Sequence, residues 1–533
     1  MKLPTFTVLP TRAGFPAADP VVLELRGPEP PTEGVLSVWR LGELVHAQPL
    51  SPGTLQELPR LPAGGYGIEL ETSAGHARTA VEVTRDDWSH LRYGFVASYQ
   101  PDKDVGAVAD LARRLHLNGI QFYDWAYRHA DLLGGGETYD DALGQPITLD
   151  TVRRLVRALR ETGTASFGYA AVYAVGPEEW PRWEHHALLR PTGEPYALGD
   201  FLFILDPAAP EWLEHFRKDL ARSLDEVGFD GFHLDQYGYP KHAALADGTA
   251  VDVAASFVDL IGAVRDHLPG SRLIFNNVND FPTWDSASAP QDAIYIEPWE
   301  PALTLGALAD IVKRARASSN GQPIVLAAYQ QVYKQASVEA ADRASALTMA
   351  TLYSHGATQL LAGEYGRLLV DPYYVRNHEA QPQTLDFLTR WYDFLVEHDA
   401  LLLDPSIVEV TTSYVGDYND DLDVRFADAE VTQTAEPGAV WRRVTRTSEG
   451  LVVHLINLVG QTNTCWDAPR SAPVVVGGGE LRFRYVRGRT PRVRVADPDG
   501  TARLQDLDVR LDGDHAVATL PALTIWQVIN VVL

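Results

Sequence analysis

From about residue 90 to residue 364 the sequence alternates short apolar runs with longer amphipathic stretches. The apolar runs have the length and composition of buried strands, and most of the gaps between them follow a helical period. Eight such β-then-α units over about 300 residues predict a closed (β/α)8 barrel. An open doubly wound sheet is disfavoured, because its first strand would lead into a glycine-rich phosphate turn, which ASYQPD is not. The eight expected strands are 93–99, 119–125, 164–173, 229–238, 272–278, 293–299, 323–330 and 357–364.

Strand-rich regions flank the predicted barrel on both sides. Residues 1–88 contain short alternating runs such as VVLELRG and TAVEVTR between Pro and Gly turns, which predict an immunoglobulin-like β-sandwich. From about residue 403 the strand pattern returns, in runs such as GLVVHLINLV and TIWQVINVVL, and predicts a C-terminal antiparallel β-sandwich. The expected domains are therefore residues 1–88, 89–402 and 403–533.

The charge balance limits the partners that such a chain can bind. It carries 45 Lys and Arg against 71 Asp and Glu, a net charge of −26 that repels phosphate backbones and anionic membrane surfaces. Its one cysteine cannot form an internal disulfide or a cysteine-based zinc site. The N-terminal segment lacks the apolar core of a signal peptide, and no stretch is apolar enough to span a bilayer. We therefore expect no nucleic-acid or membrane partner and a cytoplasmic location, or secretion if a leader has been removed.

Two acidic residues stand at the carboxyl ends of predicted strands. Because side chains alternate along a strand, Asp235 shares a face with His233, and Glu297 shares a face with Tyr295. Barrel enzymes carry their reactive groups at this end of the strands. Two carboxylates that meet there can break a glycosidic bond, one attacking the anomeric carbon and the other protonating the departing oxygen. An isolated acid more often caps a helix or pairs with a cation, but the matching positions of these two favour catalysis.

Further side chains at strand ends are candidates for binding a substrate. Asp124 and Trp125 offer a carboxylate for hydroxyl groups and an indole for stacking on a ring, or else a helix cap beside a core tryptophan. Asn277 and Asn279 either bond to substrate hydroxyls or fix turns. The aromatic candidates beside the two acids are Tyr237, Tyr295 and Trp299.

Two further segments need an interpretation. The connection over residues 174–206 is unusually long, and long loops at that end of a barrel usually shape a substrate cleft. The acidic run DYNDDLD at 417–423 spaces its oxygen ligands as a calcium loop does, but Leu422 stands where such a loop needs glycine. A solvated loop is therefore favoured over a calcium site, and we expect neither a metal nor a cofactor.

Several stretches of the chain form a recognisable set. They are RYGF at the start of the predicted barrel, FYDWAYRH (122–129), FDGFHLDQYG (229–238), FNNVND (275–280), YIEPWE (295–300) and HLINLVG followed by WD (454–467). In this order they resemble glycoside hydrolase family 66, whose members are dextranases and cycloisomaltooligosaccharide glucanotransferases. The resemblance covers nearly the whole chain and is weakest in the first 88 residues.

The resemblance implies a retaining enzyme that acts on α-1,6-linked glucans by double displacement, with Asp235 as nucleophile and Glu297 as acid/base. Asp235 belongs to a DGxxxDxxG stretch that also contains Asp230, Gly231 and Gly238. The implied substrate is dextran or an isomaltooligosaccharide. Three alternatives stay open: a transglycosylase that makes cyclic or longer isomaltooligosaccharides, an α-glycosidase of a different barrel family that favours terminal residues, and a glucan-binding protein without catalysis. Cyclising members carry an inserted carbohydrate-binding module late in the barrel, and its absence between 330 and 357 disfavours cyclisation.

Such a mechanism also makes demands on the acids themselves. Asp235 must stay ionised while Glu297 holds a proton, so their surroundings must separate the two pKa values. Tyr295 and Trp299 are expected to supply apolar surroundings that favour the protonated form of Glu297. The two carboxyl groups are expected about 5–6 Å apart, the spacing of retaining rather than inverting enzymes.

Overall fold

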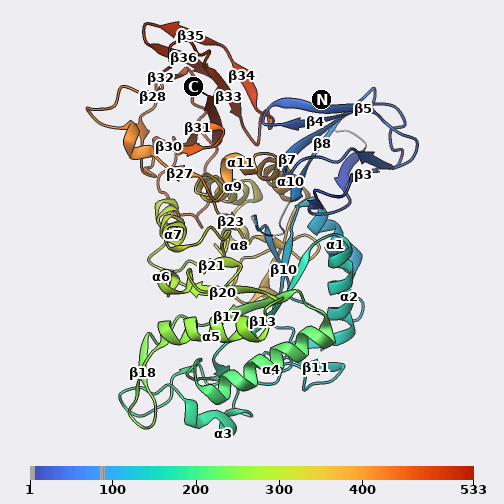
Figure 1. The fold of residues 1–533 in the computed structure, drawn as a ribbon, viewed down its shortest axis with the longest axis vertical. Helices are drawn as coiled ribbons and strands as arrows, with labels where there is room; N and C mark the ends of the chain where they lie inside the picture. Colours follow the sequence, from blue (N-terminus) through green and yellow to red (C-terminus); the bar gives the residue numbers. More distant parts are fainter. Residues whose placement is uncertain (1–5, 85–87, 89, 533) are drawn as a thin grey trace.

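The computed structural model describes residues 6–84, 88 and 90–532. Figure 1 shows N-terminal strands in blue, a central sheet with helices around it, and C-terminal strands in orange and red. The domain boundary expected at residue 89 lies outside the described residues. Within the described part of the chain, no helix is both long and apolar enough to cross a membrane.

The expected strands of the central region form one sheet. Its members are β9 (Tyr93–Val96), β10 (Gly119–Phe122), β13 (Ala165–Ala171), β17 (Gly231–Asp235), β20 (Arg272–Val278), β21 (Ala293–Glu297), β22 (Ile324–Leu326), β23 (Thr358–Gln359), β24 (Ala362–Gly363), β25 (Arg367–Leu368) and β26 (His378–Glu379). The parallel part runs in the order β23, β22, β21, β20, β17, β13, β10, β9, β24, and β25 and β26 continue it antiparallel. β23 and β24 belong to one segment that pairs with β22 on one side and with β9 on the other. The sheet is therefore strongly curled.

Several strands end earlier than the sequence pattern predicts. β9 ends at Val96 and β10 at Phe122, each three residues before the expected end, and the eighth strand is interrupted at 360–361. The chain leaves the sheet at these points to enter the loops at the carboxyl ends of the strands. Asp124, for example, has a φ of 43°, which no β-strand adopts.

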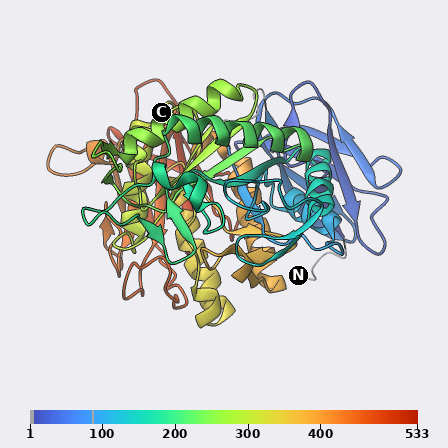
Figure 2. The same cartoon turned by 90° about the horizontal axis from the view of Figure 1, so that it is seen from below.

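Helices lie around the curled sheet, as Figures 1 and 2 show from two directions. The longer ones are α1 (Val105–Arg114), α2 (Leu149–Glu161), α4 (Pro210–Val227), α5 (Val253–His267), α7 (Leu305–Ser318), α9 (Val338–Ser354) and α10 (Pro382–Glu397). The short ones are α3 (Trp180–Trp183), α6 (Thr283–Ser286), α8 (Val332–Gln335), α11 (Asp399–Leu402) and the 3₁₀ helices η1 (Glu184–His186), η2 (Tyr374–Arg376) and η3 (Thr411–Tyr414). Their apolar stripes face the sheet: α2 buries Val152, Leu155, Val156 and Leu159 and exposes its arginines more.

Short hairpins follow three of the parallel strands. These are β11 (Thr138–Asp140) with β12 (Pro146–Thr148), β14 (Ala174–Val175) with β15 (Ala197–Leu198) and β16 (Leu202–Ile204), and β18 (His242–Ala244) with β19 (Ala250–Asp252). They follow β10, β13 and β17, so they stand at the carboxyl ends of the parallel strands. They extend the rim above the sheet at the end where the two candidate acids lie.

The N-terminal region contains two sheets that share one apolar core. One holds β1 (Thr7–Pro10), β3 (Val21–Arg26) and β6 (Leu55–Leu58), and the other β2 (Phe15–Pro16), β4 (Val35–Arg40), β5 (Glu43–Pro49), β7 (Gly64–Thr72) and β8 (Gly75–Thr84). Leu23 and Leu58 from the first sheet lie in the same cluster as Leu36 and Ile68 from the second. The pairing of β2 with β8 is parallel and the others are antiparallel.

The C-terminal region repeats this arrangement. One sheet holds β27 (Val408–Glu409), β29 (Val431–Thr432), β30 (Val440–Thr447), β31 (Gly450–Asn457), β33 (Arg492–Ala496), β34 (Gln505–Leu507) and β37 (Trp526–Val532), and the other β28 (Leu422–Arg425), β32 (Gly479–Arg484), β35 (Val509–Asp512) and β36 (His515–Leu520). Val453 and Ile529 of the first sheet share a core with Leu481 and Ala518 of the second. The structure is therefore multidomain, with separate cores at both ends of the chain, and the expected domain boundaries stay a prediction.

Candidate active site

The two candidate acids meet at the carboxyl ends of neighbouring strands. β20 lies between β17 and β21, and its register places Asn276 opposite Tyr295 and Val278 opposite Glu297. Asp235 ends β17 and Glu297 ends β21. Because side chains alternate along each strand, Asn276 of β20 points to the same side as both acids and lies between them.

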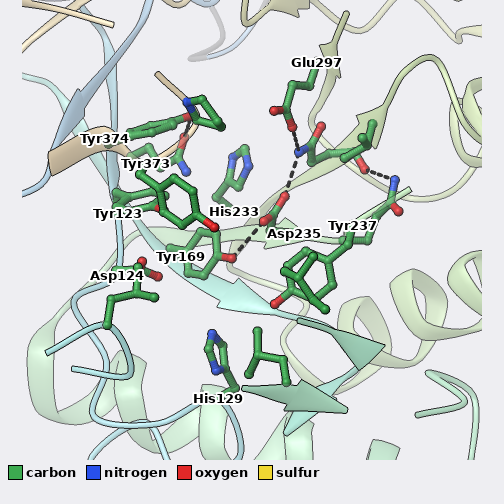
Figure 3. Close-up of a pocket in the computed structure, with 18 of the residues that line it drawn as sticks. Tyr123, Asp124, His129, Tyr169, His233, Asp235, Tyr237, Glu297, Tyr373 and Tyr374 are labelled. Carbon is green, nitrogen blue, oxygen red and sulfur yellow. Dashed lines mark hydrogen bonds between the residues drawn. The ribbon is translucent and has the colours of Figure 1, made fainter. Parts of the chain in front are cut away.

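A single amide nitrogen links the two carboxylates. Asn276 Nδ2 donates to Asp235 Oδ1 at 2.7 Å and to Glu297 Oε2 at 2.9 Å. The other oxygen of Asp235, Oδ2, accepts from Tyr169 Oη at 2.8 Å. Since both carboxylates reach one nitrogen, they lie closer than the roughly 6.5–9.5 Å that separates the acids of inverting glycosidases. Figure 3 shows this chain of hydrogen bonds from Tyr169 through Asp235 to Glu297.

Burial raises the pKa of both acids, and it does so unequally. Burial raises the pKa of Asp235 to about 6, although hydrogen bonds from Asn276 and Tyr169 lower it. The pKa of Glu297 rises to about 7, because burial and the negative charge of Asp235 outweigh the hydrogen bonds that lower it. Within the described residues, neither acid forms an ion pair with a lysine or arginine. The order of the two values leaves Asp235 as the more readily ionised acid and Glu297 as the proton holder.

The acids open into a cavity of about 300 Å³ with a largely aromatic wall. Figure 3 shows several of these rings converging on Asp235. Tyr123 stacks on Tyr374 with ring centroids 4.3 Å apart, and Trp299 packs against Tyr329 at 5.6 Å. The aromatic side chains that line the cavity are Tyr123, Tyr169, Phe201, Tyr237, Trp299, Tyr329, Tyr373 and Tyr374. Flat apolar faces with a few polar groups at one end suit the faces and hydroxyl groups of a sugar ring.

The long connection after β13 forms part of this wall, as expected. Leu198, Phe201 and Leu202 from this connection line the cavity. Tyr239, in the loop after β17, donates from its hydroxyl to Ala197 O at 3.0 Å and so holds the connection beside the rim. The length of the segment therefore serves to close one side of the cavity.

Three of the predicted binding residues line the cavity: Asp124, Tyr237 and Trp299. Burial and the charges of Asp141 and Asp235 raise the pKa of Asp124 to about 8, so this carboxyl is protonated at neutral pH and can donate a hydrogen bond. His129 also lines the cavity. Burial, together with Arg128, lowers its pKa to about 4, so it is a neutral group.

Two predicted aromatic residues, Trp125 and Tyr295, are buried and are not among the side chains that line the cavity. Trp125 is fully buried, donates from Nε1 to Tyr169 O and packs against Phe229 at 4.8 Å. Tyr295 is 1% exposed and its hydroxyl bonds to that of Tyr374 at 2.9 Å. Each ring is enclosed by neighbouring side chains, so its assignment to substrate binding stays a prediction that these contacts do not support. Tyr295 nevertheless lies on the face of β21 that leads to Glu297.

The two predicted asparagines also have structural contacts in place of substrate contacts. Asn277 is fully buried, donates to Tyr295 O at 2.9 Å and accepts from Ser286 Oγ. Asn279 has a φ of 52° and joins its turn to the next loop by donating to Glu300 O at 3.0 Å. These contacts support the turn-fixing interpretation, and the assignment of Asn277 and Asn279 to substrate binding stays a prediction.

Strand parity identifies the missed polar contacts only once the register between the strands is known. Asn276 and not Asn277 has the parity of Asp235, since β17 and β20 pair His233 with Ile274. Tyr169 is likewise in register with His233 on β13. Tyr329 and Tyr373 come from loops and Tyr374 from the first position of the short helix η2, for which no such periodic signal exists.

Residues with the spacing of metal ligands occur elsewhere. Among the described residues, two groups qualify: His185, His186 and Glu211, and Glu82, His90 and Asp399. In the acidic run at 417–423, Asp420 and Asp421 form ion pairs with Arg482 and Arg484. The chemistry available at the cavity itself is thus that of two closely spaced carboxyl groups with different proton affinities.

Paired acids in an aromatic cavity, at the carboxyl end of a curled parallel sheet, are the arrangement of a glycoside hydrolase. The chain belongs to glycosyl hydrolase family 66, whose model matches residues 57–530. This match includes the central sheet and nearly all of the C-terminal strands, as the resemblance of the individual motifs predicts.

Two curated relatives show what members of this kind do. A cycloisomaltooligosaccharide glucanotransferase of Niallia circulans is 24% identical over 340 residues, which cover 58% of this chain and 34% of that protein. A dextranase of Streptococcus salivarius is 25% identical over 289 residues, which cover 46% of this chain and 35% of that protein. The matched regions thus span about a third of the length of these relatives.

A solved structure extends the likeness of the fold to the whole chain. The cycloisomaltooligosaccharide glucanotransferase of Paenibacillus sp., determined with cycloisomaltoheptaose, superposes with a TM-score of 0.87 at 19% identity. The superposition covers 98% of this chain and 99% of that one. All parts of this fold, including the strands at both ends, are therefore shared with that protein.

Proposed function

We propose that the protein is a retaining glycoside hydrolase that cleaves α-1,6-glucosidic linkages of dextran or isomaltooligosaccharides. The observation that carries this proposal is the bridging of Asp235 and Glu297 by Asn276 Nδ2, because it brings two acids of different pKa to one anomeric centre. The linkage is inferred from the names of the relatives, a dextranase and a glucanotransferase of isomaltooligosaccharides.

In the proposed first step, Asp235 attacks the anomeric carbon and Glu297 gives its proton to the departing oxygen. Hydrogen bonds from Tyr169 and Asn276 favour the ionised form of Asp235 and fix the orientation of its carboxylate. Burial and the charge of Asp235 keep a proton on Glu297. Once Asp235 is consumed in the glycosyl-enzyme, its charge no longer raises the pKa of Glu297, which then acts as a base.

In the proposed second step, Glu297 removes a proton from the acceptor that attacks the glycosyl-enzyme. Water as acceptor gives hydrolysis, and a sugar hydroxyl gives a longer or cyclic product. The aromatic cavity wall can hold either a leaving chain or an acceptor chain. The same intermediate thus leads to both activities found among the relatives.

The proposal includes an assignment of the architecture. We take the curled sheet as the core of a (β/α)8 barrel over residues 89–402, since the segment holding β23 and β24 borders both β22 and β9. Residues 1–88 and 403–533, before and after it in the sequence, would then form β-sandwiches, the first immunoglobulin-like and the second mainly antiparallel. On this assignment the cavity stands at the end of the barrel where such enzymes act.

The proposal is tested by incubating the protein with linear dextran and with isomaltooligosaccharides of defined length. Chromatography over time separates linear from cyclic products, and proton NMR of the first products reports the anomeric configuration. We expect linear α-anomers from dextran and no products from α-1,4-linked maltooligosaccharides, the matched control substrate. A first product with β configuration contradicts the mechanism, action on the control contradicts the linkage, and cyclic products identify a transferase. Binding of dextran without any product would identify a non-catalytic glucan-binding protein.

A further inference from the structure

Away from the cavity, two histidines and a glutamate form a compact cluster. His185 and His186 lie in η1, and Glu211 lies in the first turn of α4. His185 Nε2 and His186 Nε2 are 3.1 and 3.3 Å from the same atom, Glu211 Oε2. The three possible ligand atoms all lie within 4.8 Å of one another.

We propose that His185, His186 and Glu211 form a binding site for a divalent transition-metal ion, with Zn²⁺ as the best match. Two imidazole nitrogens and one carboxylate oxygen are the ligands of known three-residue zinc sites, which leave the remaining positions to water. Ligand atoms bonded to zinc at about 2.0–2.1 Å in a tetrahedron are roughly 3.3 Å apart. Two of the three separations already match this value. The third separation, between the ligand nitrogens of the two histidines, is within 4.8 Å.

The surroundings hold the three ligands in place while leaving them accessible. Trp183, directly before η1, is buried and packs edge-on against Trp212 of α4 with ring centroids 5.1 Å apart. Asp206 N donates to His186 O at 2.9 Å. These contacts fix η1 against the start of α4. The side chains of His185 and Glu211 are more than half exposed, so an ion and its water ligands can reach them.

The other group with metal-like spacing is a useful contrast. Glu82, His90 and Asp399 also converge, but Arg92 Nη2 lies 2.6 Å from Glu82 Oε2. A guanidinium at that position already neutralises the carboxylate and repels a cation. Within the described residues, no lysine or arginine forms an ion pair with Glu211. The charge of the first cluster therefore favours a metal ion, and that of the second does not.

An ion at this cluster would fasten the long connection after β13 to α4. η1 lies in the middle of that connection, and Leu198, Phe201 and Leu202 of the same connection line the cavity. A metal ion that joins η1 to Glu211 adds bonds between two elements otherwise joined by packing and weak ion pairs. Metal binding is thus expected to reduce opening of residues 184–206, whichever reaction the cavity carries out.

The site is tested by calorimetric titration of the full chain with ZnCl₂ after dialysis against EDTA. We expect one ion per chain, and a loss of affinity of at least about tenfold in each of His185→Ala, His186→Ala and Glu211→Gln. Matched controls are Glu184→Gln, a neighbouring exposed acid, and His242→Ala, an exposed histidine in β18; both should bind as the wild type does. No saturable binding up to about 1 mM, or equal binding by all three variants and the wild type, overturns the proposal.

Hydrogen exchange gives an independent readout of the fastening. Saturating ZnCl₂ should slow amide exchange in residues 184–206 of the wild type, but not in Glu211→Gln. Thermal melts of the metal-free variants show whether each remains folded. Equal exchange with and without ZnCl₂ in a wild type that binds the ion would overturn the fastening of this segment.

Discussion

The buried acids at the cavity and the buried acid Glu82 have different partners. At the cavity, Asp235 and Glu297 are hydrogen-bonded by an amide and phenol groups. At the junction between the N-terminal sheets and the central sheet, Glu82 is paired with Arg92 at 2.6 Å and with His90 at 3.0 Å. Burial raises the pKa in all three, but Arg92 and His90 reverse its effect and lower the pKa of Glu82 to about 2.

The comparison shows that partners, more than depth, decide what a buried acid can do. Neutral donors offset only part of the cost of burying a carboxylate, which leaves the pKa values of Asp235 and Glu297 at about 6 and 7. A guanidinium more than offsets that cost and keeps Glu82 charged over the whole physiological range. The cavity acids are therefore suited to exchanging protons, and the junction acid is suited to holding two regions together.

The largest expected effect comes from removing either cavity acid. Asp235→Ala and Glu297→Gln should each lower the turnover of dextran by at least about 10³-fold, or roughly 4 kcal/mol of transition-state stabilisation. Both variants should stay folded, since neither acid is the partner of a buried cation. Initial rates on dextran and circular dichroism check the two parts. Near wild-type activity in either variant contradicts the assignment.

Glu82→Gln is the matched change at the junction. It should leave the turnover number of the folded protein unchanged, because Glu82 pairs with Arg92 at the amino ends of the parallel strands, whereas the cavity lies at their carboxyl ends. A loss of turnover as large as that of Glu297→Gln would remove the distinction between the two regions.

The second expected effect concerns stability. Arg92→Met leaves Glu82 buried without its main counter-charge and should lower the free energy of unfolding by about 3–5 kcal/mol. Denaturant titration near pH 7 measures the change. Arg153→Met, which removes an exposed partner of Glu137, is the control and should cost less than about 1 kcal/mol. Equal effects of the two changes would show that the Arg92–Glu82 pair adds no more to the free energy of unfolding than the Arg153–Glu137 pair does.

The part of the site that could be predicted from the sequence is the part that depends on local periodicity. The alternation of apolar runs and helices located the strands of the central sheet, and parity within a strand placed Asp235 and Glu297 at matching ends. These features follow from neighbouring residues alone. They held although β9 and β10 end three residues early.

What could not be predicted depends on contacts between distant segments. Trp125 stands at a strand end like a binding residue, but Phe229 and Tyr169 from other segments enclose it. The choice between Asn276 and Asn277 needs the register of β20 against β17, which no local pattern states. The partners that give the cavity acids and Glu82 different pKa values are likewise distant from these acids in the sequence.

The third expected effect is a separate change in the pKa of each cavity acid when a single tyrosine hydroxyl is removed. Tyr169→Phe removes a hydrogen bond that lowers the pKa of Asp235, so the acidic limb of the activity profile should move to higher pH. Activity at pH 6 should fall roughly two- to tenfold, while the basic limb stays in place. A profile of kcat/KM against pH measures both limbs.

Tyr329→Phe is the matched variant for the other acid. Hydrogen bonding by Tyr329 lowers the pKa of Glu297, so its loss should move the basic limb to higher pH and leave the acidic limb in place. In wild type we expect a bell-shaped profile with its maximum between about pH 6 and 7. If both tyrosine variants moved the same limb, the roles of the two acids would have to be reassigned or shared.

The smallest expected effect is a gain in folding stability on removing a charged group, where a loss is more common. The pKa of Glu297 in the folded protein, about 7, lies above the ordinary value of 4.5, so its ionisation costs stability as pH rises from 4.5 through 7. Glu297→Gln should therefore be more stable than the wild type at pH 8, and this gain should disappear at pH 4.5. Glu82→Gln should lose stability at pH 8, because its depressed pKa stabilises the fold above pH 4.5. Thermal midpoints of both variants, measured across this pH range, test whether the partners of Glu297 and Glu82 give them opposite effects on stability. A loss of stability in both variants at pH 8 would contradict this.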